Sequence, residues 1–132
     1  MDILETAKNT ILEALPNIDA IYLFGSYASS TSNSKSDLDL AILPKKKLDK
    51  VKLWNLAQEI AIKIDKDVDL IDLFEASTVF KFQIVHEGRI IYSTSDKVCN
   101  FFDNYVHSSY LKFNEERKEI LDKIKKTGKI YE

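Results

Sequence analysis

The chain has 132 residues, a length that suits one compact domain and leaves little room for a second. Apolar residues make up 45% and charged residues 30%, which is typical of a folded, water-soluble protein and excludes a disordered or fibrous one. The net charge of −2 argues against direct nucleic-acid binding over a broad surface, and no apolar run reaches the roughly 20 residues of a membrane span. The single cysteine, Cys99, and the absence of a signal-peptide pattern favour the cytoplasm.

The hydrophobic pattern predicts short strands that alternate with helices. In chain order we expect a helix over 2–15, strands over 20–24 and 37–43, a helix over 48–64, a strand over 67–73, a helix over 75–86, a strand over 89–92 and a long helix over about 95–127. Gly88 is expected to close the third helix in the left-handed conformation, and Ser95 to cap the last one. Because only a turn separates the first two strands, we expect them to be antiparallel. The prediction is an α/β (α+β) fold, in which helices cover a mixed sheet of about four strands in one domain, 1–132.

A loop signal follows the first expected strand. The apolar run 20–24 ends at Gly25-Ser26, and the polar segment up to Ser36 has too few large apolar side chains for a core. Glycine permits close backbone approach to a ligand, and amide groups at the start of a helical turn form an anion site that a serine hydroxyl extends. Gly25 and Ser26 are therefore candidates for binding phosphate groups.

Two aspartates stand at the start of the next expected strand. Alternation places the side chains of Asp37 and Asp39 on one face of that strand, about 6.5–7 Å apart. Two carboxylates that face the same way repel each other unless a cation lies between them. Oxygen-only ligation suits Mg²⁺, which takes one or two carboxylates together with phosphate oxygens. The pair predicts a magnesium site.

A third acid is expected on the strand over 67–73. Asp69 lies in a run that reads as buried, where an unpaired charge would be costly, so a metal is its expected partner. Asp67 and Asp72 compete for the same role. Asp72 lies on the opposite face of the strand from Asp69, and its other interpretation is a cap at the strand end. These candidates stay open on the residues alone.

These residues together resemble a known family. Gly25-Ser26, ten intervening residues and Asp37-Leu38-Asp39 are similar to the signature of the DNA polymerase β nucleotidyltransferase superfamily. Val68-Asp69-Leu70 fits the position of its third acid. The segment 86–92 before the final helix resembles the minimal nucleotidyltransferase (MNT) branch, and in particular the antitoxins of HEPN–MNT toxin–antitoxin pairs. The likeness covers nearly the whole chain.

The resemblance implies a nucleotidyltransferase fold and the transfer of AMP from ATP to a tyrosine hydroxyl of a partner HEPN ribonuclease toxin. It implies that Asp37, Asp39 and Asp69 hold two Mg²⁺ ions, with Asp69 also helping to remove the acceptor proton. Gly25 and Ser26 would bind the terminal phosphates. The chain departs from many relatives at Tyr27, which stands where they carry an arginine, and in the turn that follows; cationic help for the phosphates from this turn is missing.

Two other functions stay open beside this one. A non-catalytic antitoxin would neutralise its toxin by docking alone, which the missing arginine allows but the three acids argue against. An enzyme that modifies a small molecule would be expected to have a further substrate-binding domain, for which the chain has no room.

The remaining prominent residues are expected to play structural roles. The lysine run 45–47 reads as a solvated turn, and Cys99 as a core residue. Trp54 and the pair Phe101-Phe102 are expected to pack inside the domain.

Overall fold

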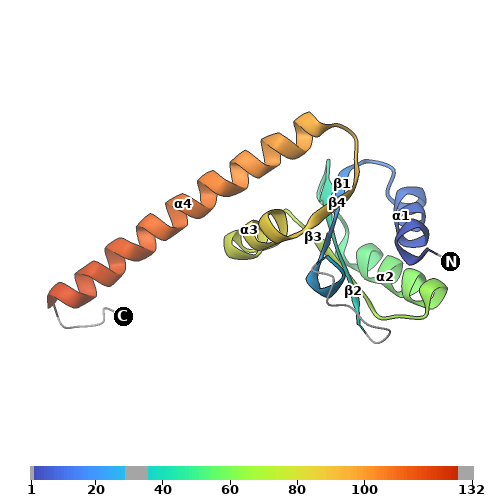
Figure 1. Cartoon of the computed structure of the whole chain (residues 1–132), viewed down its shortest axis with the longest axis horizontal. Helices are drawn as coiled ribbons and strands as arrows, with labels where there is room; N and C mark the ends of the chain where they lie inside the picture. The colour runs from blue at the N-terminus through green and yellow to red at the C-terminus, as the bar shows by residue number, and fades with distance from the viewer. Residues whose placement is uncertain (1, 29–35, 128–132) are drawn as a thin grey trace.

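The computed structural model describes residues 2–28 and 36–127. Within them a four-stranded sheet lies between two layers of helices, and the last helix runs on well past the sheet (Figure 1). The elements in chain order are α1 (Ile3–Ala14), β1 (Ile18–Phe24), the 3-10 helix η1 (Gly25–Tyr27), β2 (Leu38–Pro44), α2 (Lys50–Ile64), β3 (Val68–Asp72), α3 (Thr78–Glu87), β4 (Arg89–Ser93) and α4 (Asp96–Thr127). The expected order of elements is confirmed.

The sheet is mixed, as predicted. Its strand order is β3-β2-β1-β4; β1 is antiparallel to both β2 and β4, and β2 is parallel to β3. Parallel pairing of β2 with β3 is possible because α2 crosses over between them, whereas the segment between β1 and β2 brings its strands back side by side. This topology puts β3 at one edge, next to β2.

Each face of the sheet has its own apolar core. On one face α1 and α2 pack against alternating strand residues, with Ile21, Leu40 and Ile60 fully buried. On the other face α3 and the beginning of α4 pack against Tyr22, Ala41 and their neighbours. Figure 1 shows α1 and α2 on one side of the strands and α3 and α4 on the other. The period-2 alternation of the strands feeds both cores.

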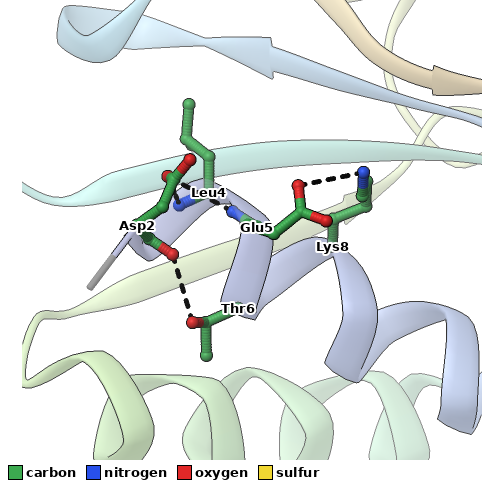
Figure 2. A network of polar contacts seen from close by, with 5 residues as sticks. All are labelled: Asp2, Leu4, Glu5, Thr6 and Lys8. Carbon is green, nitrogen blue, oxygen red and sulfur yellow. Dashed lines mark hydrogen bonds and ion pairs between the residues drawn. The ribbon is translucent and has the colours of Figure 1, made fainter.

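The helices begin at side-chain caps. At α1, the Asp2 carboxylate accepts hydrogen bonds from the backbone N–H groups of Leu4 (3.0 Å) and Glu5 (3.4 Å), and Figure 2 shows this cap with Thr6 donating to the Asp2 carbonyl oxygen. The Glu5–Lys8 ion pair extends the same turn. Asp49 caps α2 in the same way, and the expected cap of α4 is confirmed because Ser95 accepts from the N–H of Val98 at 3.2 Å.

Three local expectations were wrong. Gly88 ends α3 in an extended conformation (φ −81°, ψ 178°), and glycine is required there because a Cβ would overlap the carbonyl oxygen of Ile84. Trp54 is 64% and Phe101 77% exposed, although Phe102 is buried as expected. Trp54 lies outside the buried face of α2, which consists of Leu53, Leu56, Ala57, Ile60 and Ile64.

The final helix is the longest element. It contains 32 residues, and its first four turns supply the buried side chains of Cys99, Phe102 and Val106. In the described parts of the chain, no helix combines the length and the apolar character that crossing a membrane requires.

Candidate active site

The glycine after β1 forms one wall of the site. Gly25 has a φ of +74°, in the left-handed region that residues with a side chain rarely adopt. A Cβ on Gly25 would overlap Oδ2 of Asp39 and lie 3.2 Å from its Cγ. The β1–β2 register, which pairs Phe24 with Asp39, produces this contact. Glycine therefore serves two needs at once: the backbone turn and the space for a carboxylate.

Two of the predicted acids lie side by side on neighbouring strands. In the parallel β2–β3 ladder Asp39 pairs directly with Asp69, between the apolar pairs Leu38–Val68 and Leu40–Leu70. Asp37 precedes β2 by one residue and is exposed. Asp37 and Asp39 flank the fully buried Leu38, so strand alternation directs both away from the core that Leu38 joins. The fold thus brings Asp37, Asp39 and Asp69 to the end of the sheet at which β1 ends, η1 follows, and β2 and β3 begin.

The carboxylates interact electrostatically. The pKa of Asp39 is raised above its ordinary value, first because the side chain is partly buried, then because of the negative charges of Asp69 and of Asp37. Desolvation and nearby like charges both disfavour the ionised form of a carboxyl group. The raised pKa of Asp39 therefore agrees with the geometry, in which the three acids lie in one small region.

The oxygen donors fit a cation such as Mg²⁺. Within residues 2–28 and 36–127, no three Asp, Glu, His or Cys side chains are already gathered closely enough to hold an ion. Mg²⁺ does not need such a cage, because it keeps waters and substrate phosphate oxygens beside one or two carboxylates. When no cation is bound, repulsion among the carboxylates of Asp37, Asp39 and Asp69 also favours side-chain positions that are farther apart. The donor chemistry and the strand register both suit the ion.

The position of β3 in the sheet corrects the expectation that Asp69 is buried. Asp69 is exposed, not buried, because β3 is the edge strand of the sheet. The buried acid of this strand is Asp72, which is 6% exposed. Its Oδ1 accepts a hydrogen bond from the N–H of Phe74 at 2.9 Å, and Oδ2 has no partner among the described residues. Asp72 therefore caps the end of β3, as its alternative interpretation held, while Asp69 pairs with Asp39.

A cation that sequence analysis did not single out lies near the turn. The Lys66 ammonium is 5.7 Å from the ring centroid of Tyr27, the last residue of η1. Lys66 also lines a hollow with Ser36 and Asp37. The sequence offers no signal for this contact, because nearly 40 residues separate Tyr27 from Lys66 and only the parallel β2–β3 pairing brings them together.

Gly25 borders a second hollow. Its volume is about 310 Å³, near the lower end for small-molecule sites. The aromatic rings of Phe24 and Phe80 meet edge to face there, 5.6 Å apart, and Gln83 and Glu87 supply polar groups. Asp37 thus lines one hollow and Gly25 another.

Comparison with known proteins identifies the class to which this fold and site belong. The model of the family described as "Polymerase beta, Nucleotidyltransferase" matches residues 6–97, which include every candidate site residue. The chain belongs to this nucleotidyltransferase family.

Individual relatives of the chain narrow the comparison to a particular kind of nucleotidyltransferase. The chain is 39% identical over 121 residues to the protein adenylyltransferase MntA of Shewanella oneidensis, with 89% of this chain and 86% of MntA covered. A crystal structure of a toxin–antitoxin with AMP-PNP contains a chain that is 34% identical, with a TM-score of 0.85, covering 94% of this chain and 98% of that one. In a structure of tri-AMPylated S. oneidensis HEPN toxin in complex with MNT antitoxin, the matching chain is 32% identical (TM-score 0.77), with 93% and 98% covered.

Proposed function

We propose that this chain is a Mg²⁺-dependent protein adenylyltransferase, which transfers AMP from ATP to a tyrosine hydroxyl of a HEPN-type ribonuclease toxin and thereby acts as its antitoxin. The contact of Asp39 with Gly25 and its pairing with Asp69 carry the proposal, because two neighbouring carboxylates beside a glycine turn suit a metal-bound triphosphate. The relatives support the substrate and the partner: one is named a protein adenylyltransferase, and others were solved with AMP-PNP or with an AMPylated HEPN toxin.

In this proposal the turn after β1 binds the phosphates of ATP. Gly25 lets the backbone approach closely, and the Ser26 hydroxyl adds a donor at the start of η1. Lys66, held over the Tyr27 ring, supplies the positive charge that the turn itself lacks. The chain would therefore replace a local arginine with a lysine from the loop before β3.

Asp37, Asp39 and Asp69 would hold the metal. Bound there, two Mg²⁺ ions would neutralise the phosphates and stabilise the leaving pyrophosphate. Asp69, which is exposed on the edge strand β3, would accept the proton of an incoming hydroxyl. The tyrosine oxygen forms a bond to the α-phosphorus of ATP, the bond from that phosphorus to the bridging oxygen breaks, and pyrophosphate leaves.

The acceptor is expected to come from another protein. We interpret residues 1–132 as a single minimal nucleotidyltransferase domain, and the relative solved with an AMPylated HEPN toxin supports a protein acceptor. Spectinomycin adenyltransferase of Enterococcus faecialis shares the fold at 18% identity and a TM-score of 0.56, but this chain spans only 56% of its length. The proposal places the reaction in the cytoplasm, which agrees with the lone cysteine.

The test is to incubate the chain with α-labelled ATP, Mg²⁺ and the HEPN-type protein encoded beside its gene. We expect label on a tyrosine of that protein, loss of its ribonuclease activity, and neither effect with Asp37→Ala/Asp39→Ala. If the double variant still silences the toxin, docking alone suffices and the chain is a non-catalytic antitoxin. Label on a small metabolite, with none on protein, would instead indicate a small-molecule acceptor.

A further inference from the structure

The distal part of α4 leaves the body of the protein. The last close ring contact of α4 with its neighbour α3 is that of Tyr110, whose ring stacks on Phe82 at a centroid distance of 3.9 Å. Beyond it, residues 111–126 are almost all exposed, including Leu111 (63%), Ile120 (59%) and Leu121 (50%). Figure 1 shows this part of α4 extending away from the sheet and the other helices. At about 1.5 Å per residue, it is roughly 24 Å long.

One apolar stripe runs from the core onto this exposed segment. At about 100° per residue, the buried residues Cys99, Phe102 and Val106 lie on one face of α4. The same face continues beyond the body as Tyr110, Phe113, Ile120, Leu121 and Ile124, within about 60° of the centre of the buried stripe. A helix that is surrounded by water normally carries polar residues on all sides. An apolar face that continues beyond the hydrophobic core therefore indicates a partner that covers it.

Charges on this face argue against a second copy of the chain as the partner. Arg117 lies in the middle of the stripe, and Lys123 and Lys125 border it, against a single acid at Glu116. Two copies packed face to face would bring these cations together, and like charges at an interface are unfavourable. The face instead fits a partner helix or groove that is apolar in its centre and acidic at its rim.

The comparisons indicate which partner this is. The nucleotidyltransferase family match ends at residue 97, so nearly all of α4 lies outside the part shared with that family. The chains solved with toxin cover 92–94% of this chain, which leaves too few residues unmatched to omit α4. The helix is thus common to proteins of this kind that assemble with a toxin and is not needed to form the acid site.

We propose that the α4 stripe, defined by Tyr110, Phe113, Ile120, Leu121 and Ile124, is the docking surface for the HEPN-type toxin, which meets it with an apolar face rimmed by carboxylates. The inference rests on the proposed function for the identity of the partner. The proposal assigns toxin binding to α4 and AMP transfer to the end of the sheet formed by β1, β2 and β3, so binding and transfer can be disrupted separately.

The experiment compares two charge-matched double variants of the full chain. Ile120→Glu/Ile124→Glu places two charges on the stripe, and Leu111→Glu/Lys126→Gln makes the same change in net charge on the opposite face. Both pairs introduce only Glu or Gln, which are good helix formers, so far-UV circular dichroism should be unchanged in both. Affinity for the HEPN-type protein encoded beside the gene is measured by titration calorimetry, and AMP transfer is measured at low and at saturating concentrations of that protein.

The stripe variant should bind the toxin about 30-fold or more weakly, and the opposite-face variant within about threefold of the wild type. Transfer by the stripe variant should fall at low toxin concentration and recover at saturation, as a raised KM with little change in kcat requires. Wild-type affinity of the stripe variant would overturn the proposal, as would a wild-type chain that does not bind the toxin. A chain that dimerises alone, and that the stripe variant renders monomeric, would show that a second copy occupies the face. Binding without AMP transfer by the wild type would instead refute the proposed catalytic function and leave the docking surface standing.

Discussion

Replacement of Gly25 by alanine tests whether the contact between the turn and the acid pair sets the site. The new methyl group would overlap Oδ2 of Asp39 and lie 3.2 Å from its Cγ, so the carboxylate must rotate away. The backbone φ of +74° adds strain of about 1–2 kcal/mol for a residue with a Cβ, and a displaced side chain adds about 0.5–1 kcal/mol. We expect a total loss of about 2 kcal/mol in the free energy of unfolding. For a chain of this length that corresponds to a fall in Tm of about 7 °C.

The effect on catalysis should be much larger than the effect on stability. A loss of about 2 kcal/mol leaves a typical domain folded, but a displacement of Asp39 by about 1 Å is expected to lower AMP transfer about 100-fold. The assay is transfer of label from α-labelled ATP to the HEPN-type protein, at a temperature well below the Tm of each variant, with thermal unfolding followed by circular dichroism.

Gly88→Ala is the matched control. Its Cβ would overlap the carbonyl oxygen of Ile84 and lie 2.9 Å from that of Leu23, so it should destabilise the protein at least as much. Because these contacts are with backbone carbonyl groups and not with a carboxylate of the site, transfer should stay within about threefold of the wild type. Ile11→Val, a milder core change that costs about 1 kcal/mol, serves if Gly88→Ala fails to fold. Equal activity of folded Gly25→Ala and wild type would refute the argument that this glycine makes room for Asp39.

Four further outcomes follow from the same geometry. In Mg²⁺-free buffer at pH 7, Asp39→Asn should raise the Tm by a few degrees at most while abolishing AMP transfer, because it removes a charge that Asp69 and Asp37 repel; a lower Tm would contradict this. The raised pKa of Asp39 means that the folded state binds the proton of this carboxyl group more tightly than the unfolded state does. The contribution of Asp39 to the stability of the Mg²⁺-free wild type should therefore fall as pH rises above the ordinary pKa of aspartate. A comparison of Tm against pH between the wild type and Asp39→Asn isolates this contribution. Asp72→Ala should lose about 1–2 kcal/mol in urea unfolding with transfer nearly unchanged, whereas Asp69→Ala should lose transfer about 1000-fold with little change in stability; the reverse pattern would make Asp72 the third acid. Lys66→Met should raise the KM for ATP about tenfold, against no change for Lys63→Met on α2, and equal KM values would remove Lys66 from the phosphate site.

Local signals in the sequence were sufficient to predict the elements. Apolar runs of strand length, helical spacing and caps such as Ser95 depend on nearby residues, and the structure confirms the order of elements and the mixed sheet. The Gly25-Ser26 turn and Asp37 and Asp39 are likewise close in the chain, with alternation alone setting the faces of the two acids.

The exposed positions were harder to predict because hydrophobicity does not say what covers a residue. Trp54 and Phe101 lie on helices whose apolar residues extend beyond the face that packs, and both proved exposed. Asp69 was predicted to be buried from its apolar neighbours, but the strand order places β3 at an edge, where water reaches it. Edge or centre is a property of the assembled sheet.

The sequence by itself determined the class of fold, the turn and the first two acids, because each depends on residues near one another in the chain. The tertiary structure decided which further groups join them. The β2–β3 register pairs Asp39 with Asp69 and leaves Asp72 to cap its own strand end, and the same pairing carries Lys66 to Tyr27. Register and strand order arise from packing between distant segments, on which a local pattern carries no information.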